Sequence, residues 1–222
     1  MILKCLIIIS VILGLTFSFI NYKHDGYSDW HKRLLYFTTQ SGIWIFLSSL
    51  TIIVINFLKK KPSDEVMRAI YIVRYVFTVS ITVTGVVFCA LLAPFADSRY
   101  HPWSYFSILN HVVTPLLAIG DFFVDENRVK LGKICVSASV IPPLLYFIFS
   151  TVLSIMGTDF GRGDPYPYFF MDLNSPAGFF GLSREDMAIG TFWWILLFLL
   201  LVLGLGALYA KLNNRLIKNK SD

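Results

Sequence analysis

Thr38 and His111 are the two residues whose types could together carry out covalent acyl transfer. A threonine hydroxyl is too weak an acid to attack an ester unaided, but an adjacent imidazole can remove its proton. Thr38 lies four residues beyond Leu34 at the start of one apolar run, and His111 lies six residues beyond Tyr105 at the start of another. As membrane helices, these runs would place the two residues ~6 Å and ~9 Å from the same membrane face. The spacing therefore allows a Thr–His pair, without determining where the side chains point.

A structural interpretation of the same residues stays open. Thr38 could bond to a carbonyl one turn earlier in its helix, and His111 could bond to a neighbouring helix. Because serine and threonine are common at contacts between membrane helices, spacing alone favours this interpretation. The same reasoning assigns Thr82, Thr84 and Thr114 to packing or hydrogen bonding.

One sequence feature favours a site at His111. Pro115 follows it by four residues, and proline has no N–H to donate to the His111 carbonyl. We therefore expect a backbone carbonyl without its helical hydrogen bond, and hence a polar site, beside the histidine. Gln40, Asn110 or a backbone amide could then stabilise an oxyanion.

No metal or cofactor is expected. The other histidines fall in loops without ligand spacing, and the cysteines form no metal-binding pattern. There is no G-x-S-x-G elbow, H-E-x-x-H motif or P-loop. The loop histidines are His24, His31 and His101, and the cysteines are Cys5, Cys89 and Cys135.

The composition indicates an integral membrane protein. Of 222 residues, 56% are hydrophobic and only 15% are charged, whereas an average soluble chain has roughly 25% charged residues. So few charges cannot cover a soluble globule, which argues against a water-soluble enzyme, a disordered chain and a nucleic-acid binder. The net charge of +5 reflects basic residues between apolar runs, a pattern typical of membrane topology.

Six apolar runs are long enough to cross a hydrocarbon core of ~30 Å as helices. We predict an all-α fold, with residues 1–222 forming a single polytopic domain of six transmembrane helices. The connection 158–188, rich in glycine, proline and aromatic residues, is expected to cap the outer mouth of the bundle. The predicted spans are residues 2–20, 34–58, 69–95, 105–124, 134–157 and 189–210.

The first run resembles a secretory signal peptide, because Lys4 precedes an apolar stretch. The triplet Thr16-Phe17-Ser18 is a poor match to a small-x-small cleavage site, so we predict a retained first helix.

The basic residues predict the orientation. Eleven lie in the loops after the second and fourth spans and in the C-terminal tail, and six lie in the other three loops. The positive-inside rule then places both termini in the cytoplasm. The eleven are Lys59, Lys60, Lys61, Arg68, Arg128, Lys130, Lys133, Lys211, Arg215, Lys218 and Lys220, and the six are Lys23, Lys32, Arg33, Arg99, Arg162 and Arg184.

Arg74 and Asp121 are ionisable residues inside predicted spans, where such residues are costly. Arg74 lies five residues from Ala69, and Asp121 lies three residues from Val124, so both are near the cytoplasmic end of their helices. We predict that they form an ion pair that joins the third and fourth spans. A proton or ion pathway would need more carboxylates at mid-membrane.

Four short segments carry a resemblance to a known family. They occur in the family's order and, with the flanking spans, the match extends from about residue 34 to residue 208. The segments are YFTTQS, ITVTGVVFCALLAP, LNHVVTPLLAIGDFF and DPYPYFFMDL. Four such segments in this order on six predicted spans resemble the androgen-induced and androgen-dependent TFPI-regulating protein family. The chain is similar to the bacterial branch of that family.

The resemblance implies a multispanning lipid hydrolase with an intramembrane threonine and histidine. Characterised animal members cleave fatty acid esters of hydroxy fatty acids. The family threonine falls on Thr38, and the family histidine falls on His111. A Y-P-F segment with a following acid is matched by residues 166–169 and Asp172. A second histidine that animal members carry before the catalytic one is missing from this chain.

We therefore expect a lipid-ester hydrolase of the bacterial cell membrane, with a membrane lipid as its substrate and no nucleic-acid partner. The alternative is a non-enzymatic membrane protein that binds a lipid or a partner, or serves as a transport or assembly subunit. Asp164 and Asp172 are candidate residues of the site's mouth, although turn stabilisation is the commoner role for aspartates in such loops. The sequence indicates no oligomeric state.

Overall fold

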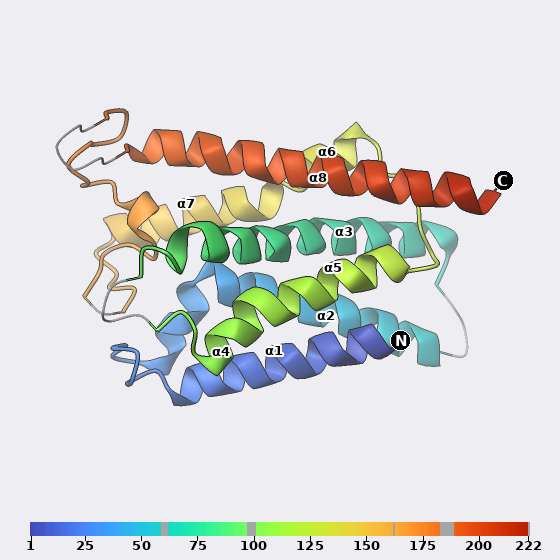
Figure 1. Ribbon diagram of the computed structural model, residues 1–222, viewed down its shortest axis with the longest axis horizontal. Helices are drawn as coiled ribbons and strands as arrows, with labels where there is room; N and C mark the ends of the chain where they lie inside the picture. The colour runs from blue at the N-terminus through green and yellow to red at the C-terminus, as the bar shows by residue number, and fades with distance from the viewer. Residues whose placement is uncertain (59–61, 97–100, 162, 183–188, 222) are drawn as a thin grey trace.

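The computed structural model describes residues 1–58, 62–96, 101–161, 163–182 and 189–221 (Figure 1). Six helical segments in this part of the chain are long and apolar enough to span a membrane, which confirms the predicted all-α membrane bundle. The described residues contain no strand, only an isolated bridge between Leu182 and Ile189. Of the basic residues used to predict the orientation, Lys59, Lys60, Lys61, Arg99, Arg162 and Arg184 lie outside the described residues, as does the side chain of Lys220.

Three of the spans are interrupted helices. The third begins as α3 and ends in a π-helical turn, η2, and the fourth contains the π-helical turn η3 between α4 and α5. The fifth is divided into α6 and α7 just before Pro142, whose ring cannot continue the ladder of helical hydrogen bonds. The elements are α1 (Ile2–Ile20), α2 (Phe37–Phe57), α3 (Asp64–Val87), η2 (Phe88–Leu92), α4 (Tyr105–Ile108), η3 (Leu109–Val113), α5 (Thr114–Val124), α6 (Lys133–Ala138), α7 (Ile141–Ile155) and α8 (Thr191–Ser221).

Helix α3 is the central helix of the bundle. It contacts α2 and α5 on one side and α6, α7 and α8 on the other, and Figure 1 shows it between these two groups. About 61% of its most apolar stretch is buried, compared with 22–33% for the other spans. Helix α1 packs against α2 and α5, where Ile7 and Val11 join a core cluster with Ile45 and Ile81. The first predicted span is thus a packed part of the bundle.

The two ends of the bundle differ in their connections. Both chain ends lie at one end, here called the terminal end (Figure 1). The opposite, loop end carries the 3-10 helix η1 (Trp30–Leu35) and the described part of the connection between α7 and α8. That connection packs back onto the bundle: Phe160 is fully buried and its carbonyl accepts a hydrogen bond from the Tyr36 hydroxyl at 3.2 Å.

Three helix boundaries differ from the approximate predicted spans. Helix α2 begins at Phe37 rather than at residue 34, because η1 forms first and Tyr36 adopts an extended conformation. Helix α3 begins earlier than predicted, at Asp64, where Ser63 caps the helix by accepting from the Val66 amide. Helix α8 continues past residue 210, since Asn213 and Asn214 bond to the connection at residues 129–131.

Four buried charges join three elements near the terminal end. Arg74 on α3 donates to Asp121 on α5, as predicted, and also to Asp125 just after α5. Lys4 on α1 donates to Asp121 at 2.9 Å and lies 3.6 Å from Asp125. Two cations thus balance two carboxylates, which removes the net charge from a site where Arg74 is only 1% exposed. Sequence analysis missed Lys4 and Asp125, which lie at the flanks of apolar runs.

Replacing Asp121 with asparagine leaves Lys4 and Arg74 facing a single carboxylate. We expect the free energy of unfolding to fall by about 3 kcal/mol, because breaking a buried ion pair leaves an uncompensated charge. Thermal unfolding in detergent measures the loss. The exposed Glu65, in the first turn of α3, provides the control Glu65→Gln, which should unfold like the wild type. An Asp121→Asn protein as stable as Glu65→Gln would contradict the stabilising role of the cluster.

Candidate functional site

Thr38 and His111 meet at the loop end of the bundle. The Thr38 Oγ1 lies 3.2 Å from the His111 Nε2, and the His111 Nδ1 lies 2.8 Å from the Ser107 carbonyl oxygen. Because a carbonyl can only accept a hydrogen bond, Nδ1 carries the ring proton of the neutral imidazole. Nε2 is then the acceptor for the Thr38 hydroxyl. This is the relation between a nucleophile, its base and a group that orients the base.

The π-helical turn η3 positions His111. Pro115 has no N–H, so the ordinary helical bond to the His111 carbonyl is missing, and the Thr114 amide bonds instead to the Leu109 carbonyl, five residues back. Helix α3 packs closely against this turn at Gly85. A Cβ built on Gly85 would lie 3.0 Å from the His111 carbonyl oxygen and 3.2 Å from the Pro115 Cβ.

A second π-helical turn, η2, holds the plane of the imidazole. Phe88, its first residue, is fully buried and stacks on the His111 ring, with the ring centroids 4.2 Å apart and the planes at 17°. Single π turns inside helices are frequent at functional sites. Here two such turns from adjacent spans face each other, and together they restrict both the position and the tilt of the base.

Thr38 is the second residue of α2 and lies at its positively polarised end. The first ladder bond of α2 runs from the Gln40 amide to the Tyr36 carbonyl, so the amides of Phe37, Thr38 and Thr39 have no acceptor within the helix. Such amides carry a partial positive charge and favour an anion. They supply the backbone donors expected beside the nucleophile.

Tyr168, from the connection between α7 and α8, brings its hydroxyl to these amides. It lies beside the Thr38 side chain and the Phe37 and Thr38 backbone, whose interactions with it lower its pKa. Desolvation by burial raises the pKa of Tyr168 to about 12. The phenol is therefore protonated at neutral pH and can donate to an oxygen beside Thr38.

A cavity of about 270 Å³ opens onto the pair. Thr38 and His111 line it and are only partly buried, so a ligand can reach both. Arg33 also lines it: its guanidinium lies 4.4 Å from the centre of the Tyr27 ring and donates to Asp25. Nearby, the hydrogen bond from Lys32 holds the pKa of Asp159 below its usual range.

The other predicted site residues divide into two groups. Asn110 and Asp164 line the cavity, although the Asn110 amide donates to the Gly14 carbonyl at 3.3 Å. Gln40 lies outside it: its amide donates to the Leu34 carbonyl at 3.2 Å, and its side chain borders a separate apolar hollow. Asp172 accepts from the Asn174 amide at 2.9 Å and so stabilises a turn.

The three threonines predicted to have structural roles do have them. Thr82 donates to the Thr78 carbonyl, Thr84 bonds to Ser41 at 2.9 Å and Thr114 bonds to Ser10 at 2.9 Å. Sequence analysis did not assign four residues of the site, namely Arg33, Phe88, Ser107 and Tyr168. For Tyr168, the contact with α2 comes from a distant loop. The signal available for it was its place in the DPYPYFFMDL segment, since nothing local indicates that this loop returns to α2.

The chain matches no protein-family model, no curated protein and no solved structure. The fold and the site define a class: a six-helix integral membrane protein with a Thr–His pair in a cavity at one end of the bundle.

Substituting Gly85 with alanine tests the close approach of α3 to η3. The new methyl group would press on the His111 carbonyl and the Pro115 ring, neither of which can rotate away. We expect the free energy of unfolding to fall by about 1 kcal/mol, measured by thermal unfolding. Gly42→Ala on α2 is the matched control, because a Cβ there meets nothing within 4 Å, and the helix should gain up to about 1 kcal/mol. Equal changes in unfolding free energy for the two variants, or a gain for Gly85→Ala with a loss for Gly42→Ala, would contradict the tight contact.

Proposed function

We propose that this protein is an integral membrane lipid-ester hydrolase with Thr38 as nucleophile and His111 as general base. The observation that carries the proposal is the 3.2 Å contact between Oγ1 and Nε2, with Nδ1 bonded to the Ser107 carbonyl. The resemblance of four sequence segments to the androgen-induced protein family supports the same two residues. Fatty acid esters of hydroxy fatty acids are candidate substrates on the basis of that resemblance.

Acylation begins when His111 Nε2 takes the proton of the Thr38 hydroxyl as Oγ1 attacks the acyl carbonyl. Negative charge then develops on the carbonyl oxygen. The amides at the start of α2, which have no acceptor within the helix, and the Tyr168 phenol are the donors assigned to stabilise it. As the tetrahedral intermediate collapses, the bond to the alkoxy group breaks, and His111 returns its proton to the departing alcohol.

Deacylation repeats these steps with water. His111 removes a proton from water, the resulting hydroxide attacks the acyl-Thr38 ester, and the same donors stabilise the second oxyanion. The intermediate releases the fatty acid, and Thr38 Oγ1 recovers its proton from His111. Each turnover thus consumes one water and yields one acid and one alcohol, with no cofactor needed in any step.

We also propose an orientation with both termini in the cytoplasm of a bacterial cell. The connection between α5 and α6 and the C-terminal part of α8 lie at the terminal end (Figure 1). They carry the basic residues Arg128, Lys130 and Lys211, and the positive-inside rule assigns such a side to the cytoplasm. The Thr38–His111 cavity would then open at the outer face of the membrane, and substrates would come from the outer leaflet.

An activity-based fluorophosphonate probe on membranes tests the nucleophile. We expect Thr38→Ala to abolish labelling, and His111→Ala to slow it about a hundredfold or more because the base is lost. Thr39→Ala is the matched control: it removes a hydroxyl from the adjacent residue in the same cavity and should label like the wild type.

Robust labelling of Thr38→Ala would eliminate Thr38 as the nucleophile. If folded wild-type protein neither labels nor hydrolyses any ester of a lipid panel, the enzymatic proposal is wrong. A non-enzymatic lipid-binding or partner-binding role would then be favoured.

Replacing Tyr168 with phenylalanine removes one oxyanion donor while keeping the ring. We expect kcat for ester hydrolysis to fall about a hundredfold, with KM little changed, since the lost bond acts mainly in the transition state. Tyr36→Phe is the control: this tyrosine lines the same cavity, but its hydroxyl donates to the Phe160 carbonyl. Steady-state kinetics of Tyr168→Phe and Tyr36→Phe on the same ester substrate compares their kcat and KM values. Equal effects of both substitutions would assign Tyr168 a packing role.

A further inference from the structure

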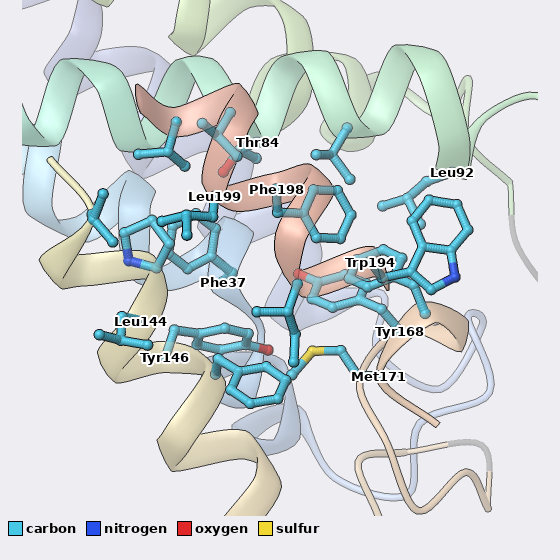
Figure 2. A pocket seen from close by; sticks show the side chains of 18 residues that line it. Phe37, Thr84, Leu92, Leu144, Tyr146, Tyr168, Met171, Trp194, Phe198 and Leu199 are labelled. Atoms are coloured by element: carbon cyan, nitrogen blue, oxygen red, sulfur yellow. The ribbon is translucent and has the colours of Figure 1, made fainter. Parts of the chain in front are cut away.

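A second cavity lies directly beside the proposed catalytic site. It has a volume of about 250 Å³ and lies between α3, α7, α8 and the 3-10 turn η4 (Phe169–Met171) (Figure 2). Its lining is almost entirely hydrocarbon and aromatic. Two of the hydroxyls that border it are already bonded, Thr84 to Ser41 and Tyr146 to the Leu35 carbonyl at 3.0 Å. The chemistry of this cavity suits a hydrocarbon chain.

The two cavities share part of their walls. Leu92 and Tyr168 line both, and Phe37, which precedes Thr38, lines the apolar one. In Figure 2, Tyr168 and Trp194 lie at one side of the apolar cavity and Leu144 at the other. A chain whose carbonyl carbon sits at the Thr38 hydroxyl would have to pass Tyr168 to reach the apolar cavity. Its alcohol portion would remain in the polar cavity with Arg33 and Asp164.

The apolar cavity is open toward the membrane. Leu144 on α7 and Leu199 on α8 both line it and are 49% and 36% exposed. The lining residues of α8 run from Trp194 to Val202, a distance of ~12 Å along the helix. In the bilayer, the surface around Leu144 and Leu199 faces lipid chains. A chain can thus enter sideways without crossing water.

We infer that this apolar cavity binds the acyl chain of the substrate, which enters from the bilayer between Leu144 and Leu199. The inference rests on the proposed function and names its substrate class: esters of long-chain fatty acids that are dissolved in the membrane. Because such a chain leaves one apolar environment for another, the cavity selects by length and shape rather than by hydrophobicity. Short-chain esters leave the cavity empty and lose those contacts.

A substitution that narrows the opening between Leu144 and Leu199 tests the selectivity for chain length. Leu199→Trp places a bulky ring at the mouth of the cavity, whereas Leu200→Trp places the same ring on the adjacent residue, which is 59% exposed and lines neither cavity. With a series of nitrophenyl esters from acetyl to palmitoyl, we expect Leu199→Trp to lower the palmitoyl-to-acetyl ratio of kcat/KM about tenfold or more. Leu200→Trp should keep the wild-type ratio. Unchanged ratios in both variants would overturn the inference.

A binding test separates this inference from the proposed catalysis. A palmitoyl ester with a diazirine near the end of its chain is photolysed in membranes containing Thr38→Ala protein, and the cross-links are mapped by mass spectrometry. We expect cross-links within residues 140–147 and 194–202, which Leu199→Trp in the same background removes and Leu200→Trp retains. Cross-links spread evenly over the lipid-facing surface would mean bulk lipid only and would overturn the inference.

The two proposals fail in different ways. Specific cross-links in a wild-type protein that hydrolyses no ester would support the acyl site and overturn the hydrolase. Ester hydrolysis through Thr38 with no preference for chain length, and no specific cross-links, would support the hydrolase and overturn the acyl site.

Discussion

The proline at position 115 is the constraint on which the site depends. Because its nitrogen cannot donate, the fourth span cannot keep an α-helical ladder through His111, and it forms the π turn Leu109–Val113 instead. The extra residue in that turn directs the imidazole toward α2, and Gly85 lets α3 approach the turn closely. A backbone irregularity, fixed by packing on the central helix, thus sets the direction of the candidate base. Phe88, from the π turn of the third span, then holds the ring plane.

The bundle uses charges differently at its two ends. At the terminal end, Lys4, Arg74, Asp121 and Asp125 neutralise one another and lock α1, α3 and α5 together. At the loop end, the Thr38–His111 pair is uncharged. Its polar groups line a cavity and remain accessible to a ligand. The ion-paired end therefore supports an end that can admit a ligand, which suits a site whose substrate must enter and whose products must leave.

The two adjacent cavities match the two parts of an amphiphilic ester. A polar space with imidazole, hydroxyl and guanidinium groups borders an apolar space that reaches the lipid-facing surface. Tyr168 separates them and brings its hydroxyl to the amides at the start of α2. One loop residue thus contributes a donor to the proposed chemistry and a wall to the proposed acyl site. An ester that extends from one cavity into the other would have its carbonyl group at Tyr168, beside both the polar groups and the apolar lining.

The sequence alone determined the six apolar helices, because hydropathy over some twenty residues reflects a local requirement of the membrane. It also indicated Thr38, His111 and the Arg74–Asp121 pair, since polar groups inside apolar runs are conspicuous. Tertiary structure decided the rest. Helix rotation placed Asn110 in the cavity and Gln40 outside it, and the fold of η1 made Thr38 part of the first turn of α2. The donor from Tyr168 comes from a connection about 130 residues downstream. No local pattern encodes such a contact, because it depends on how a loop packs after all the helices have assembled.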